Sequence, residues 1–155
     1  MNVEELPDRA RAWVEAFNSH DAEATMRQLA DGGTFDDPVT DKPVGGDTLR
    51  QYIHETYEAF PDVEIVPKDY YEDGETVVLE IDYTGTFEGP FEGIPPTGEY
   101  AEMPAVIVLT FDEDGVTTCR EYWNEATFRD ELGLTFPTVL RHVPRLVAGK
   151  LKAMV

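Results

Sequence analysis

The 155-residue sequence has little of what marks a secreted or membrane protein. Its single cysteine, Cys119, excludes an internal disulfide bond, which agrees with a reducing compartment. The apolar runs are too short to span a bilayer. The N-terminal stretch MNVEELPDRARAW has acidic residues where a secretory signal has basic ones. We therefore expect a cytoplasmic protein with no membrane partner.

Basic residues are also scarce. Twelve lysines and arginines face 32 acidic residues, which gives a net charge of −20. Binding to phosphate groups needs a basic face, so we expect no nucleic-acid partner. An acidic, lysine-poor surface suits concentrated salt, where screening weakens the repulsion between like charges. The composition indicates a halophilic protein, and the alternative is an ordinary acidic protein.

Motifs for metal and phosphate binding are missing. The three histidines, His20, His54 and His142, lack the spacing of metal ligands. The glycines of 85–98 lie between predicted strands rather than before a helix, where phosphate would bind. Cys119 has no visible partner for nucleophilic catalysis, which favours a buried thiol.

The hydrophobic pattern predicts helices first and strands afterwards. Apolar residues at helical spacing predict one helix up to Phe17, a second capped by Asp21 and stopping at Gly32-Gly33, and a third capped by Asp47 and ended by Pro61. The pattern then alternates, which predicts strands over 63–71, 76–87, 100–111 and 116–124, with a short one at 34–36. Residues 125–154 are predicted to be helical and split by Pro144.

This order predicts an α+β fold in which a curved antiparallel sheet packs against three N-terminal helices and leaves a conical hollow. We expect one domain over 1–135 and a C-terminal helical extension over 136–155. Residues 132–155 hold four bases and no acid, so this segment carries +4 and the rest carries −20 − 4 = −24. We expect the segment to be attracted to an acidic surface, its own or that of a partner subunit.

Four stretches occur in a family-specific order: AWVEAFNSHDAEATMRQLADGGTFDDPV, AFPDV, GTFEGPFEGIPPTG and REYWNEATFRDELGL. Together they resemble the SnoaL-like polyketide cyclases of the NTF2-like superfamily, from about Trp13 to Leu134. The resemblance implies a cone-shaped α+β barrel with an apolar pocket for a small hydrophobic molecule. It also implies no metal or organic cofactor, and a homodimer formed through the outer face of the sheet. Some members of the family catalyse an intramolecular aldol ring closure.

The segment ADGGTFDDPVTDKPVGGDTLRQY is similar to ketosteroid isomerases of the same superfamily. Their general base maps to Asp37, at a strand end before Pro38, where a carboxylate could take a proton next to a carbonyl group. The alternative for Asp37 is a turn residue that satisfies backbone N–H groups. The two hydrogen-bond donors of the isomerases map to Trp13 and Ile107. Ile107 cannot donate, so we do not expect steroid isomerisation in that form.

The sequence departs from the cyclase pattern at two positions. Phe87 stands where the family usually has histidine, and Asn124 stands where it usually has aspartate. Two ionisable positions are therefore neutral, which makes a binding role or a different chemistry more credible.

The candidate catalytic residues are Asp37 and Asn124. The candidate ligand-binding residues are Trp13, Phe17, Tyr52, Phe60, Phe87, Phe91, Arg120 and Tyr122, and Tyr83 could add a polar contact. On the last strand, alternation puts Arg120, Tyr122 and Asn124 on one face and Cys119, Glu121 and Trp123 on the other. We expect the first set to face the cavity. Arg120 could instead pair with Glu80 or Asp82.

The stretch over 85–98 is expected to form a lid. Pro95-Pro96 stiffens this connection between two strands, and Phe87, Phe91 and Ile94 would close the mouth of the cone. The alternative is a hairpin that packs on its own sheet.

Three functions fit these residues. The first is a cofactor-independent enzyme that takes a proton from a hydrophobic carbonyl compound, with Asp37 as the base. The second is a non-catalytic module that binds an apolar ligand in the same hollow. The third is a dimerisation domain whose C-terminal segment is exchanged between subunits.

Overall fold

The structure is a computed structural model, which describes residues 1–154. The helices and strands follow in the order η1 (Val3–Glu5, a short 3-10 turn), α1 (Asp8–Asn18), α2 (Ala22–Met26), β1 (Leu29–Asp36), α3 (Gly46–Ala59), β2 (Glu64–Asp73), β3 (Thr76–Thr86), β4 (Tyr100–Phe111), β5 (Val116–Trp123), α4 (Glu125–Glu131) and α5 (Val139–Ala153). In the part of the chain that is described, no helix combines the length and the apolar character needed to cross a membrane.

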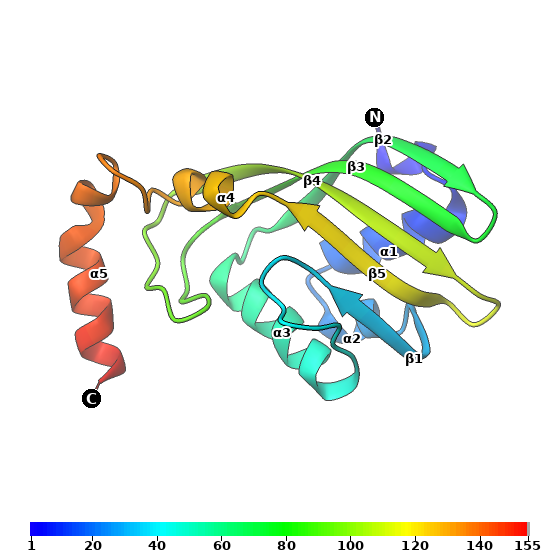
Figure 1. Ribbon diagram of the computed structural model, residues 1–155, viewed down its shortest axis with the longest axis horizontal. Coiled ribbons are helices and arrows are strands. Elements are labelled where there is room, and N and C mark those ends of the chain that lie inside the picture. Colours follow the sequence, from blue (N-terminus) through cyan, green and yellow to red (C-terminus); the bar gives the residue numbers. More distant parts are fainter. Residues whose placement is uncertain (155) are drawn as a thin grey trace.

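One five-stranded sheet organises the chain, with the strand order β1-β5-β4-β3-β2. The sheet curves over α1, α2 and α3, which lie on its inner face, and α5 stands apart at one end (Figure 1). The predicted α+β fold, with a curved sheet against three N-terminal helices, is confirmed. The sheet differs from the prediction at one edge, because β1 runs parallel to β5 while the other pairs are antiparallel.

Strand β1 is longer than predicted, and the helix before it is shorter. The second helix ends at Met26 rather than at the glycine pair. Gly32 and Gly33 lie inside β1, where the register with β5 shifts between Leu29 and Thr34. A Cβ atom on Gly33 would come within 2.6 Å of the carbonyl oxygen of Val116 on β5. The glycines therefore allow an irregular, close strand pairing rather than a helix end.

The helices use the apolar spacing in the sequence. Ala10, Trp13 and Val14 form the buried side of α1. Asp21 caps α2 as predicted, because its side chain accepts the backbone N–H of Glu23 at 2.9 Å. The prediction that Asp47 caps the third helix is wrong: α3 begins one residue earlier, after an N-cap at Gly45.

The C-terminal helices break before Pro144, which was predicted to split them. Gly133 has φ of 70° and follows α4, while the N–H of Leu134 donates to the carbonyl of Arg129 at 2.9 Å. This left-handed glycine ends α4. Pro144 lies inside α5. Because proline has no N–H group, the backbone carbonyl of Leu140 receives no hydrogen bond from residue 144. Leu140 is exposed, so water can donate to this carbonyl instead.

The core consists of two clusters of buried side chains. The larger one joins α1 and α3 to the inner face of the sheet, around Leu79 and Ile107. The smaller one gathers around Phe60 and Phe87 below the β3–β4 connection. Phe17, Tyr52 and Tyr83 contact both clusters. A cavity remains between the two clusters, and Phe17, Tyr52 and Tyr83 line it.

Replacing Phe87 with alanine tests the smaller cluster. Phe87 is fully buried and stacks on Phe60 with ring centroids 5.3 Å apart. We expect Phe87→Ala to lower the free energy of unfolding by about 3–5 kcal/mol. Phe136→Ala is the matched control, since Phe136 is 80% exposed, and it should change the value by less than about 0.5 kcal/mol. Urea unfolding of both variants measures this, and equal losses would contradict the assignment of Phe87 to the core.

Candidate functional site

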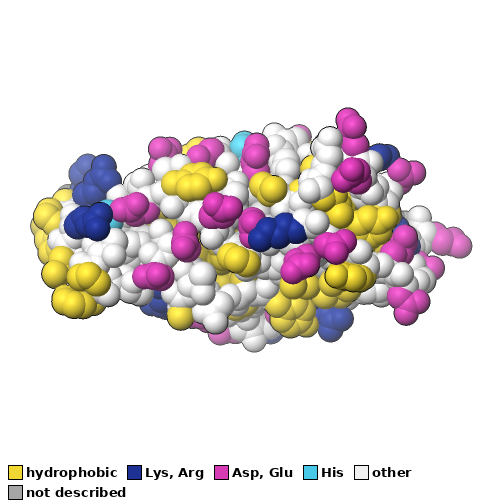
Figure 2. Space-filling model, turned by 90° about the horizontal axis from the view of Figure 1, so that it is seen from above, with side chains coloured by type: hydrophobic (Ala, Val, Ile, Leu, Met, Phe, Trp, Pro, Cys, Tyr) yellow, Lys and Arg dark blue, Asp and Glu magenta, His cyan; other side chains and the backbone are white. Residues whose placement is uncertain are grey.

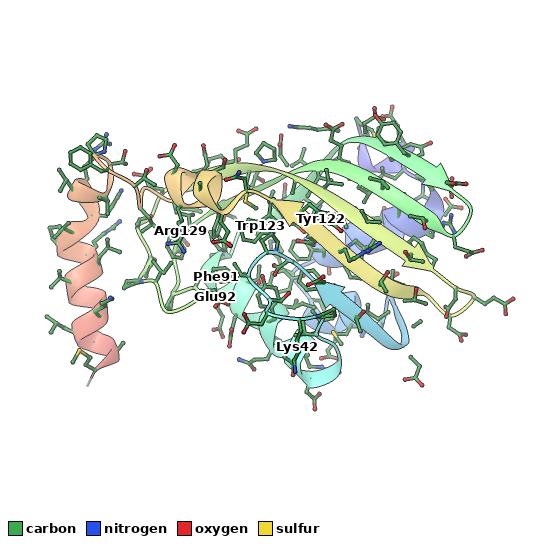
Figure 3. All side chains as sticks on the ribbon, viewed as in Figure 1. Lys42, Phe91, Glu92, Tyr122, Trp123 and Arg129 are labelled. Atoms are coloured by element: carbon green, nitrogen blue, oxygen red, sulfur yellow. The ribbon has the colours of Figure 1, made fainter. Side chains whose placement is uncertain are left out.

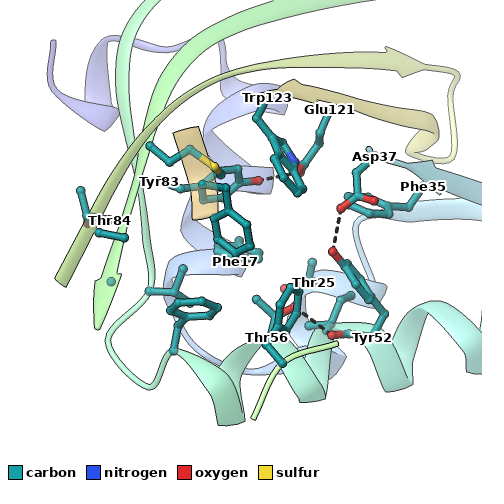
Figure 4. Close-up of a pocket in the computed structure, with 18 of the residues that line it drawn as sticks. Phe17, Thr25, Phe35, Asp37, Tyr52, Thr56, Tyr83, Thr84, Glu121 and Trp123 are labelled. Atoms are coloured by element: carbon teal, nitrogen blue, oxygen red, sulfur yellow. Dashed lines mark hydrogen bonds between the residues drawn. The ribbon is translucent and has the colours of Figure 1, made fainter. Parts of the chain in front are cut away.

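An apolar cavity of about 100 Å³ lies between the curved sheet and the helices. Nine aromatic side chains line it together with two carboxyl groups, those of Asp37 and Glu121 (Figure 4). The aromatic residues are Trp13, Phe17, Phe35, Tyr52, Phe60, Tyr83, Phe91, Trp123 and Phe128.

Asp37 follows β1 and is 7% exposed. Its Oδ1 atom accepts the backbone N–H groups of Val39 and Thr40, both at 3.0 Å. Its Oδ2 atom accepts the hydroxyl of Tyr52, from α3, at 2.6 Å. The turn after Pro38 thus fixes one oxygen while the other lies in the cavity. Asp37 is therefore both a turn residue that accepts backbone N–H groups and a carboxyl group in the cavity lining.

Glu121 extends from β5 into the same cavity and is 8% exposed. Its Oε1 atom accepts the hydroxyl of Tyr83, from β3, at 2.6 Å. Burial raises the pKa of Glu121 to about 8, although the Tyr83 hydrogen bond acts in the opposite direction. The charge of Asp37 raises this pKa further. Burial therefore favours the neutral form of Glu121.

The two carboxyl groups form a coupled pair. Burial also raises the pKa of Asp37, but four donors oppose this effect: the Tyr52 hydroxyl, the backbone N–H groups of Thr40 and Val39, and the Thr40 hydroxyl. Glu121 has only the Tyr83 hydroxyl to oppose burial. Asp37 has more hydrogen-bond donors to stabilise a negative charge, and a charge on Asp37 favours the neutral form of Glu121. Figure 4 shows the two carboxyl–tyrosine pairs on separate walls of the cavity.

Most of the predicted ligand-binding aromatic residues reach the cavity. Trp13, Phe17, Tyr52, Phe60 and Phe91 all line it. Trp13 is 3% exposed, and its indole N–H has no hydrogen-bond partner among residues 1–154. A buried donor without an acceptor costs free energy that a ligand oxygen could recover.

The predicted orientation of the last strand is wrong. Arg120 is exposed, Tyr122 is 55% exposed, and both lie on the outer face of the sheet. The alternative pairing of Arg120 with Asp82 does not form either, since the Asp82 carboxylate lies 2.6 Å from the ammonium group of Lys68. The other set, Cys119, Glu121 and Trp123, faces inward.

Asn124 and Phe87 also lie outside the cavity lining. The side chain of Asn124 is exposed and accepts the N–H of Thr127 at 3.0 Å, which caps α4. Phe87 is fully buried in the smaller core cluster. A cap and a core position explain these two side chains without a catalytic or binding role.

Glu121 was the residue that sequence reasoning missed, although a signal was present. Its neighbours on the same face of β5 are Cys119 and Trp123, both apolar, whereas the other face carries Arg120 and Tyr122. The more apolar face of a half-buried strand points inward. Because Glu121 is charged, we expected its face of β5 to point outward despite its two apolar neighbours.

The connection between β3 and β4 closes part of the mouth. Phe91 lines the cavity and contacts the ring of Phe128, from α4, edge to face at 6.2 Å. Beyond these two rings lies a smaller hollow of about 50 Å³, which they also line together with Ile94 and Arg129. Phe91, Trp123 and Arg129 lie near one another at this end of the sheet (Figure 3). Of the three predicted lid residues, Phe91 is the one that reaches the cavity.

Residues 1–154 contain no cluster of three or more histidine, cysteine or acidic side chains that could hold a metal ion. Cys119 is fully buried, and burial raises the pKa of its thiol well above the usual value. A thiol of this kind is a poor nucleophile at neutral pH. The carboxyl groups of Asp37 and Glu121 and the hydroxyl groups of Tyr52 and Tyr83 are polar groups in the cavity lining.

The curved sheet, the helical layer and the enclosed cavity define the NTF2-like class, which includes ketosteroid isomerases. Solved structures of this class superpose on most of the chain. The polyketide cyclase proposed for Streptomyces antibioticus, IdmH, is 24% identical with a TM-score of 0.67, covering 81% of this chain and 96% of its own. AclR of Streptomyces galilaeus, proposed to be a hydroxylase, is 23% identical with a TM-score of 0.71, covering 81% and 93%. A ketosteroid isomerase-like protein of Catenulispora acidiphila, in complex with trimethylamine, is 20% identical with a TM-score of 0.70, covering 83% and 95%.

A family model assigns the chain more closely. The SnoaL-like domain model matches residues 10–118, which is more than half of the sequence. The chain belongs to the SnoaL-like domain family. A comparison with curated protein sequences gave no match.

The pH dependence of folding tests the burial of Glu121. Its pKa is about 8 in the folded protein against an ordinary value of 4.5. Between these values the folded protein keeps a proton that the unfolded chain has released, so the free energy of unfolding falls as pH rises. The slope from this group is at most about 1.4 kcal/mol per pH unit. We expect Glu121→Gln to lose this slope in urea unfolding between pH 5 and pH 8.

Glu80→Gln is the matched control, because Glu80 is exposed on the outer face of the sheet. It should follow the wild-type pH dependence. If Glu121→Gln also follows it, Glu121 does not hold a proton in the folded protein.

Proposed function

We propose that the protein is a cofactor-independent enzyme that moves a proton on a small hydrophobic carbonyl compound, as a cyclase or an isomerase. The observation that carries the proposal is the convergence of two carboxyl groups with unequal hydrogen bonding in one apolar cavity. Such a pair can supply a base and an acid on two walls of the same cavity. The membership of the SnoaL-like family supports the same class of reaction.

Asp37 is the base in this proposal. Its carboxylate takes a proton from the carbon next to the carbonyl group, and the electron pair of that C–H bond moves onto the carbonyl oxygen. The fixed turn at Val39 and Thr40 holds the Oδ1 atom, so the side chain keeps its position while Oδ2 exchanges the Tyr52 hydrogen bond for the proton.

Glu121 is the acid. Its neutral carboxyl group donates to the carbonyl oxygen as charge develops there. In ketosteroid isomerases an acid does this from the position of Ile107. In this chain Ile107 pairs with Glu121 across the strands β4 and β5, so the acid comes from the adjacent strand. The resulting enol then attacks a second carbonyl group of the same molecule, whose oxygen takes the proton from Asp37, or it takes that proton back from Asp37 at another carbon. In both cases the enol O–H returns its proton to Glu121, so both carboxyl groups recover their starting state.

The cavity size limits the substrate. Its volume of about 100 Å³ is smaller than the roughly 150 Å³ of an engineered cavity that binds benzene. A six-membered ring therefore enters only with movement of side chains at the mouth, such as Phe91 or Phe128. A longer substrate would place its reacting ring inside and the remainder at the mouth.

Exchange of hydrogen for deuterium in cyclohexanone tests the base. We expect the protein to accelerate exchange at the carbons beside the carbonyl group in D₂O, followed by NMR. Asp37→Asn should slow this exchange by about 100-fold or more, because it removes the base and preserves the shape of the side chain. Glu121→Gln should slow it as well, through the loss of the acid.

Asp36→Asn is the matched control for the base. Asp36 precedes Asp37 and does not line the cavity, so its variant should keep the wild-type rate. Exchange that is no faster with wild-type protein than with Asp37→Asn would refute the assignment of the base.

A second candidate function is the binding of a small alkylammonium ion without catalysis. Nine aromatic rings and two carboxyl groups around a cavity of this size are typical of cation–π recognition. The structural relative from Catenulispora acidiphila holds trimethylamine, which is consistent with this candidate.

Choline and 3,3-dimethylbutan-1-ol distinguish the two functions, because they share a shape and differ in charge. For a cation site we expect choline to bind at least about tenfold more tightly, measured by tryptophan fluorescence. Its affinity should rise as pH increases through about 8, where Glu121 loses its proton. Equal affinity for the two compounds would exclude the cation site.

Three further expectations belong to this proposal. We propose that the protein is a homodimer, that it works in the cytoplasm, and that its surface is adapted to concentrated salt. The net charge of −20 with only twelve basic residues supports the last of these.

A further inference from the structure

The smaller hollow next to the cavity has no role in the proposed chemistry. Its volume is about 50 Å³, and we call it the outer hollow. Phe91 and Phe128 line both spaces, so these two rings form the wall between them. The outer hollow lies where the β3–β4 connection meets α4, near Phe91, Glu92 and Arg129 (Figure 3). Hydrophobic side chains gather on the surface at this end of the molecule, which α5 also forms (Figure 2).

The outer hollow has an apolar lining and a charged rim. The apolar residues that line it besides the two rings are Val39, Ile94 and Leu134. The charged residues that line it are Glu92, Glu125 and Arg129, and all three are exposed. An apolar group gains free energy inside such a space, whereas a chain that extends to the charged side chains leaves the apolar surface. The outer hollow therefore fits a short apolar group.

Val39 places the outer hollow beside the proposed base. The backbone N–H of Val39 donates to Oδ1 of Asp37, while the Val39 side chain lines the outer hollow. Asp37 itself lines the cavity. Two residues of extended chain span at most about 7 Å, so one small molecule can reach both the base and the outer hollow. A group next to the carbon that loses its proton to Asp37 therefore lies near the wall.

Phe128 is the ring of the wall that has more freedom to move. Phe91 is 7% exposed, and two backbone hydrogen bonds with Ile94, at 3.0 and 2.8 Å, hold it in a four-residue turn. Glu92 and Gly93 at the centre of this turn have φ of 48° and 73°, as a tight hairpin turn requires. Phe128 is partly exposed on α4, and exposed side chains change rotamer rapidly. Rotation of Phe128 therefore opens the wall.

We propose that the substrate is an unbranched ketone whose carbonyl group lies in the cavity and whose alkyl chain passes Phe128 into the outer hollow. The place of the carbonyl group, between Asp37 and Glu121, rests on the proposed function. The volumes limit the length of the chain. Roughly 150 Å³ holds the six carbons of benzene, so the cavity of about 100 Å³ holds about four non-hydrogen atoms and the outer hollow holds about two. A ketone of about five or six carbons fills both spaces.

Titration with 2-alkanones, from propanone to octan-2-one, tests the proposal through tryptophan fluorescence. Trp123 lies against Phe128 with ring centroids 5.1 Å apart, so its emission reports on the wall. We expect the dissociation constant to fall by about fourfold for each added CH₂ group while the chain enters apolar space. The fall should end at about five or six carbons, where the chain reaches the charged rim.

Ile94→Phe tests the assignment of the outer hollow, because the larger side chain fills it. The gain per CH₂ group should end about two carbons earlier, while the dissociation constant of propanone stays unchanged. Leu134→Phe fills the same space from another segment and should give the same result. Ala126→Phe is the matched control, since Ala126 is exposed on α4 and lines neither space. It should follow the wild type.

Three results overturn the proposal. Affinity that stays constant from propanone onward shows that the alkyl chain does not enter the protein, and affinity that still rises at octan-2-one shows that the outer hollow does not limit its length. A wild-type profile in both filled variants shows that the chain lies elsewhere. The chemistry is tested separately, because binding needs no turnover. The expected profile in a protein that does not accelerate deuterium exchange keeps the outer hollow as a binding site and refutes the base assignment alone.

Discussion

The rest of the structure depends on stabilising a carboxylate inside an apolar cavity. The hydrogen bond from Tyr52 to Asp37 is one of the interactions that do this. Burial alone makes the charged form costly. The protein offsets this cost locally, because Oδ1 receives two backbone N–H groups from the turn after Pro38 and Oδ2 receives the Tyr52 hydroxyl. The turn comes directly after β1, and α3 supplies the tyrosine. The side chain of Asp37 thus connects the end of β1, the turn after Pro38 and helix α3.

Glu121 is the counterpart of this arrangement, because it receives much less compensation. It has one hydroxyl donor and faces the charge of Asp37, so its pKa rises to about 8. The difference in local hydrogen bonding thus favours the charged form of Asp37 and the neutral form of Glu121. Burial is the main cause of the raised pKa of Glu121, and the charge of Asp37 adds to it. The curvature of the sheet makes this coupling available, as β3 and β5 both direct side chains into the hollow under it.

The uneven distribution of charge has a separate consequence at the other end of the molecule. Acidic residues cover the sheet and helices, while the bases of the last 24 residues collect on and around α5. The helix is held to its own chain by His142, Arg145 and Gly149, which leaves its apolar side open. The cavity and the exposed apolar side of α5 therefore lie on different parts of the fold.

The sequence by itself determined the order of helices and strands, the bounds of β2 to β5 within about two residues, and the family. The order and the bounds depend on the spacing of apolar residues and on turn residues, which are local, whereas the family came from the resemblance of four stretches. It also pointed to Asp37, because a proline turn at a strand end is a local feature too. Only the tertiary structure decided that β1 lies parallel to β5, that Gly32 and Gly33 belong to a strand, and that Glu121 rather than Asn124 is the second polar group of the site. Each of these depends on which distant segment lies opposite: Val116 beside Gly33, Tyr83 beside Glu121, and Thr127 within reach of Asn124. The alternation along β5 defines two faces of the strand. The packing of the sheet against the helices determines which of the two faces points inward.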